Sequence, residues 1–209
     1  MTVEGWLWLL AGPNGSGKTT LARSGTLKRW VPAIPDHAQS PDDVARVLPA
    51  VAPGHPPRDY VRAAQEASDT LVQAAVAARR SLMVETVGSS DKFFHVIDLA
   101  QRSGMRFGLV YVTVELEALN LARVAQRVAA GGHDVPERSI LDRRERSIRN
   151  FAEFARLADA GLVLDNSLAD PVTHRARPRI VAEKRPDERW RITDAVTAPY
   201  LTHRLASLG

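Results

Sequence analysis

The stretch Gly12-Pro13-Asn14-Gly15-Ser16-Gly17-Lys18-Thr19 decides the fold of this chain. It satisfies the P-loop pattern, in which a glycine and four variable residues are followed by glycine, lysine and threonine. Its flanks fit as well, because the apolar run 6–11 precedes it and helix-compatible residues follow it. A buried strand, a glycine-rich turn and a helix in this order predict an α/β fold.

This loop has the composition of a phosphate-binding site. Glycines let backbone N–H groups turn inward around phosphate oxygens, and the helix that follows presents its positive end to the same anion. Lys18 can reach the β- and γ-phosphates, and the Thr19 hydroxyl can bind Mg²⁺ that bridges them. We therefore expect ATP and Mg²⁺ as cofactors. The residues expected to bind the nucleotide here are Gly12, Pro13, Asn14, Gly15, Ser16, Gly17, Lys18, Thr19 and Thr20.

Downstream of the loop, apolar strands alternate with helices, which predicts a parallel sheet covered on both faces. The second strand is expected just before Asp36. Further strands are predicted at 81–86, 107–114 and 162–164, and helices at 18–30, 40–49, 59–80, 91–103, 117–130 and 136–157.

The last 40 or so residues have a different pattern. Residues 179–185 and 189–193 flank Pro186-Asp187-Glu188 and predict a hairpin, and a short helix is expected to begin near Pro199. We therefore expect one domain over 1–170 and a small C-terminal extension over 171–209 that packs on it.

Composition narrows the chemistry further. Hydrophobic residues make up 44% of the 209, enough for a sizeable core, and the absence of cysteine excludes disulfides, thiolate zinc sites and thiol nucleophiles. The net charge of +4 suits phosphorylated small molecules as well as nucleic acid. No apolar segment approaches the roughly 20 residues that cross a bilayer, so we expect a soluble, cytoplasmic protein without a membrane partner.

Acidic residues near the carboxyl ends of other strands are candidates for the acceptor side of the site. Asp36 is the candidate base, because a carboxylate facing the γ-phosphate can take a proton from an attacking hydroxyl; a helix cap or an exposed loop acid is the alternative. Glu85, followed by Thr86, could hold a sugar hydroxyl or organise magnesium through water. A strand-end acid satisfied by neighbouring N–H groups is the alternative for Glu85.

Arginines dominate the segment from 123 to 149 and outnumber its acids. Arg123 and Arg127 are four residues apart and share one helix face, so both could face a phosphate near the Gly131-Gly132-His133 turn. His133 could contact the substrate, and an unused loop histidine is the alternative. Most of the other arginines are expected to form a solvated helical face.

Together these features resemble the zeta-toxin family of P-loop kinases, in a broad branch of predicted stand-alone bacterial ATPases. The matching segments are residues 11–19, 35–36, 85–86, 123–127, 131–136 and 165–167. The arginine helix that leads into Gly131-Gly132-His133-Asp134-Val135-Pro136 is much more particular to this branch than the P-loop.

The resemblance implies a P-loop NTPase of the kinase type, a three-layer α/β fold with a helical lid over about 123–149. It implies phosphorylation of a sugar hydroxyl of UDP-N-acetylglucosamine by ATP and Mg²⁺. In that reaction Lys18, Asp36 and Arg127 would be catalytic, with Asp36 as the base, and Glu85 would contact the sugar. Asn166 would lie where the purine packs.

Three alternatives stay open. A kinase for nucleic-acid ends is suggested by the basic residues between 175 and 191, but interleaved acids favour a solvated hairpin, so nucleic acid is not the expected partner. A nucleotide-dependent switch protein without a small-molecule acceptor is the second. The third is the toxin half of a toxin–antitoxin pair, a kinase with an antitoxin protein as its partner.

Overall fold

The structure is a computed structural model that describes residues 5–51, 53–54, 56–131, 135–169 and 176–208. Its strands are β1 Trp6–Ala11, β2 Ala38–Gln39, β3 Leu82–Glu85, β4 Arg106–Thr113, β5 Ala160–Asp165, β6 Arg179–Lys184 and β7 Arg191–Ile192. Its helices are α1 Lys18–Arg23, the 3₁₀ helix η1 Thr26–Arg29, α2 Pro41–Val51, α3 Pro57–Ala77, α4 Lys92–Arg102, α5 Glu117–Ala129, α6 Glu137–Leu157 and α7 Pro199–Ala206.

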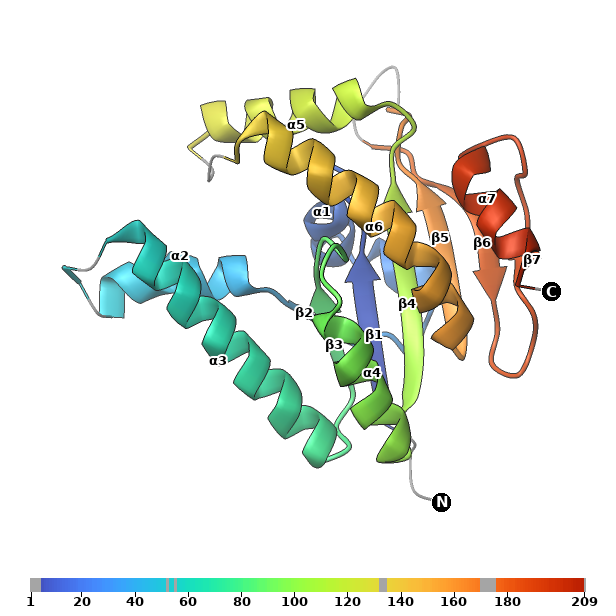
Figure 1. Ribbon diagram of the computed structural model, residues 1–209, viewed down its shortest axis with the longest axis horizontal. Coiled ribbons are helices and arrows are strands. Elements are labelled where there is room, and N and C mark those ends of the chain that lie inside the picture. Colours follow the sequence, from blue (N-terminus) through green and yellow to red (C-terminus); the bar gives the residue numbers. More distant parts are fainter. Residues whose placement is uncertain (1–4, 52, 55, 132–134, 170–175, 209) are drawn as a thin grey trace.

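The strands form one sheet in the order β2-β3-β1-β4-β5-β6-β7 (Figure 1). Strands β1 to β5 are parallel, and the β6–β7 hairpin adds two antiparallel strands beside β5. The predicted α/β fold with a mostly parallel sheet is confirmed. Because the carboxyl ends of parallel strands meet at one edge, the loops after β1, β3, β4 and β5 lie close together.

Alternating side chains of the strands fill two cores, one on each face of the sheet. Leu7 and Leu9 of β1 face the cluster that includes Phe93 of α4 and Phe151 of α6. The neighbouring Trp8 and Leu10 face the opposite cluster, which includes residues of α1 and η1. The result is three layers, with the sheet in the middle, as Figure 1 shows.

Two expectations about the first crossover are wrong. The second strand does not precede Asp36; β2 follows it as a two-residue strand, because Pro32 and Pro35 interrupt the segment and a proline cannot donate to a ladder. The first helix does not continue to residue 30. It ends at Arg23, since Gly25 takes a left-handed φ of 68° and the chain resumes as the 3₁₀ helix η1.

Candidate functional site

The glycine-rich loop joins β1 to α1 in a conformation that requires its glycines. Gly12, Gly15 and Gly17 have φ values of 142°, 74° and 95°, which L side chains rarely adopt. At Gly17 a Cβ would also collide with the side-chain amide of Asn166. The sequence therefore folds the loop back over the end of β1, with the Pro13 carbonyl accepting from the Ser16 amide at 3.2 Å.

Two side chains from outside the motif, one that follows β5 and one on α5, hold the loop in place. The Asn166 side chain donates to the Ser16 carbonyl at 2.8 Å, and its backbone amide donates to the Thr113 carbonyl at 2.8 Å. Arg123 of α5 donates to the Asn166 carbonyl at 3.0 Å and to the Gly15 carbonyl at 3.5 Å. Arg123 and Asn166, both predicted to bind the nucleotide, thus contact the loop itself.

Lys18 lies inside the loop. Its Nζ donates to the carbonyls of Gly12 at 2.6 Å and Pro13 at 2.9 Å, and the residue is buried, at 6% exposure. Burial lowers the pKa of Lys18 to about 8, although the nearby Glu85 carboxylate raises it. An ammonium has three donors, so one remains for a ligand in the loop.

The loop carries polar groups that fit a bound phosphate. Within the part of the chain that the structure describes, the amides of Gly15, Gly17, Lys18 and Thr19 donate to no backbone carbonyl. The Ser16 hydroxyl beside them is buried and has no partner among the described residues, and a hydroxyl can donate to a phosphate oxygen. Inward amides next to an ammonium are the donor set that phosphate oxygens require.

A pocket of about 160 Å³ opens beside the loop. It is lined by Thr19, Ala22, Arg23, Asp36, His37, Ala38, Asp43 and Glu85. The Thr19 hydroxyl donates to Glu85 Oε1 at 2.6 Å, so a residue of α1 and the last residue of β3 meet on its wall. The structure thereby brings together three residues predicted for the site, namely Thr19 for Mg²⁺, Asp36 as the base, and Glu85 for a sugar hydroxyl or magnesium.

Asp36 reaches this pocket from the connection between η1 and β2. Its carboxylate forms an ion pair with Lys28, and its side chain is 70% exposed. The hydrogen bond and the charge of Lys28 lower the pKa of Asp36 below its ordinary value. Asp36 is therefore ionised at neutral pH and able to accept a hydrogen bond from a hydroxyl group.

The other described residues predicted for the site lie outside the pocket wall. Thr20 is exposed on α1, and the Thr86 hydroxyl accepts from the Gly88 amide at 3.1 Å in the turn after β3. Arg127 is exposed on α5, one turn after Arg123, and its charge helps to lower the pKa of Lys18. His133 lies outside the described residues.

The sequence did not single out two residues of the pocket wall. Arg23 of α1 and Asp43 of α2 form an ion pair of 2.8 Å that closes one side of the pocket. In the sequence both residues look like ordinary surface charges of amphipathic helices. Only the structure, in which they contact each other, identifies them as residues of the pocket. No group of three potential metal ligands among histidine, aspartate and glutamate occurs in the described residues.

The mostly parallel sheet and the phosphate-type loop after its β1 strand define a P-loop kinase-like domain. The chain belongs to the AAA domain family AAA_33, whose model matches residues 7–149. The match spans β1 to most of α6, and so it contains every residue that lines the pocket. No curated protein sequence matches the chain.

Several solved structures share the fold. A chain from the complex of AvrRxo1-ORF1 and ORF2 with ATP is 16% identical at a TM-score of 0.67, over 93% of this chain and 62% of that one. A chain of the PezAT toxin–antitoxin system of Streptococcus pneumoniae is 14% identical at 0.52, over 79% and 68%. A chain of the Pnkp1/Rnl/Hen1 RNA repair complex is 16% identical at 0.53, over 73% and 47%.

The described chain therefore spans about 62% of the length of the AvrRxo1 chain that it matches. At these identities the likeness concerns the fold alone. No described helix has both the length and the apolar character needed to cross a membrane.

Proposed function

We propose that the protein is an ATP-dependent phosphotransferase that moves the γ-phosphate to a hydroxyl group of a small molecule. The observation that carries this proposal is the pocket beside the loop, where Thr19, Glu85 and Asp36 line one cavity. A phosphate site alone would serve a hydrolase or a switch equally well. An adjoining pocket with carboxylates gives an acceptor a place next to the phosphate.

On the nucleotide side, the chain contributes positive charge and directed donors. The loop amides and Lys18 would hold the β- and γ-phosphates, and Arg123 and Arg127 would add charge from α5. Thr19 would hold Mg²⁺, because a hydroxyl that donates to Glu85 keeps its oxygen lone pairs available. Bound there, Mg²⁺ supplies charge neutralisation for the phosphate oxygens.

On the acceptor side, the carboxylates would orient the incoming hydroxyl. Asp36, ionised beside Lys28, would accept the proton of the hydroxyl as its oxygen bonds to the γ-phosphorus and the bond to the leaving ADP breaks. Glu85 would fix a second hydroxyl or the Thr19 side chain. The small pocket admits the hydroxyl-bearing end of an acceptor, such as the sugar of UDP-N-acetylglucosamine, with the remainder extending outward.

A protein partner belongs to the same proposal. Two of the similar structures are a complex of two open-reading-frame products and a toxin–antitoxin system. We infer that an antitoxin-like protein binds and inhibits this chain. The test measures the rate of phosphoryl transfer with and without the product of a neighbouring small gene. An unchanged rate in the presence of excess partner would contradict the inferred inhibition.

Purified protein, γ-labelled ATP with Mg²⁺ and a panel of nucleotide sugars test the enzymatic proposal. We expect label on one acceptor class with the wild type and none with Lys18→Ala, because the variant lacks the ammonium of the loop. Lys92→Ala is the matched control, since Lys92 is a half-exposed lysine of α4 paired with Asp69. Transfer that survives Lys18→Ala would refute the assignment of the site.

A further inference from the structure

A buried arginine lies between the helices α5 and α6. Arg144 of α6 is 5% exposed, and its Nε donates to Asn120 Oδ1 at 3.0 Å. Its Nη2 donates to the carbonyls of Val114 at 3.1 Å and Glu115 at 3.0 Å, just after β4. The guanidinium therefore joins α6 to α5 and to the carboxyl end of a central strand.

The charge of this arginine meets only neutral groups. In the described part of the chain no carboxylate is within salt-bridge distance of Arg144. Its acceptors are one side-chain amide oxygen and two carbonyls, and the ring of Tyr200 lies 5.6 Å from the guanidinium carbon. Burial of a cation without a counter-charge is costly, so packing alone does not account for an arginine at this position.

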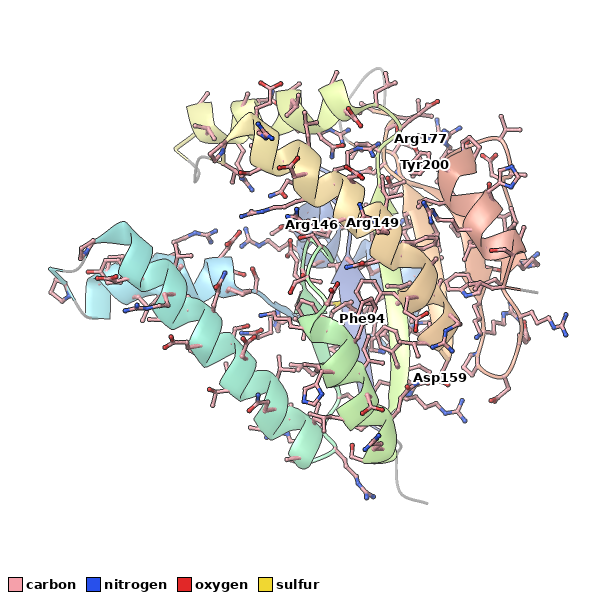
Figure 2. All side chains as sticks on the ribbon, viewed as in Figure 1. Phe94, Arg146, Arg149, Asp159, Arg177 and Tyr200 are labelled. Carbon is pink, nitrogen blue, oxygen red and sulfur yellow. The ribbon has the colours of Figure 1, made fainter. Side chains whose placement is uncertain are left out.

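The C-terminal helix closes this cluster. Figure 2 shows Tyr200 at the start of α7, near the ends of the central strands. Its hydroxyl forms hydrogen bonds with Thr113 Oγ1 at 2.8 Å and with the Val114 carbonyl at 3.2 Å. The guanidinium is thus held between a tyrosine ring and carbonyl groups, with little freedom to turn.

Asn120 connects the cluster to the phosphate loop. It is fully buried on α5, and its Nδ2 donates to the Asn14 carbonyl at 2.5 Å. Because Arg144 donates to the amide oxygen, the NH₂ group of Asn120 must face the loop. With the amide reversed, its oxygen would lie against the Asn14 carbonyl and its NH₂ group against a cation.

The direction of one peptide group of the loop follows from this contact. A trans peptide is planar, so its C=O and N–H point in opposite directions. With the Asn14 carbonyl held toward α5, the Gly15 amide points the other way, and no described backbone carbonyl accepts from it. The Gly15 amide is one of the donors that the phosphate site requires.

We propose that Arg144 is a positioning residue of the phosphate-binding loop, acting through Asn120 on the Asn14–Gly15 peptide group. The inference rests on the proposed nucleotide-binding function and adds residues outside the P-loop motif to the machinery. It also assigns a role to α7, whose Tyr200 packs against the guanidinium.

The test measures the Kd for Mg-ATP by calorimetry in the wild type, Arg144→Lys, Asn120→Ala and the double variant. Lysine keeps the charge but cannot make the forked contacts of a guanidinium. We expect each single variant to raise the Kd about tenfold, the size of one lost hydrogen bond. The double variant should bind no more weakly than the weaker single variant, because the two residues act in series.

Two further measurements keep the outcome decisive. Arg156→Lys is the matched control, an exposed arginine of α6 that pairs with Glu153, and it should leave the Kd unchanged. Melting temperatures without nucleotide separate positioning from stability alone. Variants that melt earlier but bind Mg-ATP like the wild type would overturn the inference, as would additive effects in the double variant.

If Arg144→Lys does not fold, Arg144→Gln replaces it in the cycle and the same criteria apply. Asn120→Ala leaves the Arg144 contacts to the two carbonyls in place and so tests the link through Asn120. A wild type that binds no Mg-ATP would overturn the proposed function and this inference together. A wild type that binds, with both variants equal to it, would overturn the inference alone.

Discussion

The affinity of the loop for Mg-ATP should fall as the pH rises through about 8. Lys18 is buried among loop carbonyls, and its pKa is lowered to about 8 because burial disfavours the charged ammonium. Above that pH the free protein loses the charge that faces the phosphates. The experiment therefore compares the Kd for Mg-ATP in buffers between pH 7.5 and 9.5.

The sign and size follow from linkage. Bound phosphates favour the ammonium, so the pKa of Lys18 is higher in the complex than in the free protein. Binding above pH 8 must then take up a proton, which weakens the affinity by up to tenfold, or about 1.36 kcal/mol, for each pH unit. With Lys18 charged in the complex throughout, the Kd should rise roughly 25-fold between pH 7.5 and 9.5, and only about 1.3-fold of change remains below pH 7.5.

Calorimetry in buffers of different ionisation enthalpy gives both the Kd and the number of protons taken up. Lys18→Ala should bind weakly at every pH and show no such slope, whereas Lys92→Ala should keep the slope of the wild type. A wild-type Kd that stays constant from pH 7.5 to 9.5 would refute the reasoning. The same slope in Lys18→Ala would assign the titration to another group.

Three substitutions test other contacts. Gly17→Ala should lower the free energy of unfolding by about 1–3 kcal/mol in urea denaturation, because a side chain at a φ of 95° would meet the Asn166 amide. Glu85→Gln should slow phosphoryl transfer about tenfold or more at an unchanged melting temperature, since a neutral amide would replace the acceptor of the Thr19 hydroxyl. Ser147→Ala should cost about 1–3 kcal/mol of unfolding free energy, because its buried hydroxyl joins α6 to the sheet. A wild-type unfolding free energy for Gly17→Ala or Ser147→Ala, or a wild-type transfer rate for Glu85→Gln, would contradict the contact behind that prediction.

The sequence predicted those parts of the fold whose signal is local. The run before Gly12 and the apolar segments of β3, β4 and β5 are strands because each is short, apolar and bounded by polar or glycine residues. The C-terminal hairpin and α7 were also predicted, from turn residues and from Pro199. Their place at the edge of the main sheet, beside β5, depends on pairing between distant segments and has no local signal.

The position of the second strand was predicted wrongly for a related reason. β2 has two residues, Ala38 and Gln39, and its existence depends on hydrogen bonds to β3 rather than on its own composition. A strand of this length has no periodicity to detect. Asp36 lines the pocket with Thr19 and Glu85 although it precedes β2, so its place there comes from tertiary packing and not from the predicted strand order.

The roles of individual arginines could not be predicted. Arg143, Arg144 and Arg146 are close in sequence and have the same chemistry, yet only Arg144 of the three is buried. The difference comes from the rotation of α6 against α5, which places Arg144 over Asn120. That rotation is set by tertiary packing. From an arginine-rich segment alone one can predict a positively charged surface, but not which residue each arginine contacts.

Both margins of the sheet end in very short strands, Ala38–Gln39 at one side and Arg191–Ile192 at the other. A margin of this length offers few unpaired amides and carbonyls as a template for another chain, and Arg191 adds a charge there. The long apolar strands β1, β4 and β5 are paired on both sides. We therefore expect the native protein to resist edge-to-edge aggregation in concentrated solution, and to become aggregation-prone when the β6–β7 hairpin detaches and uncovers β5.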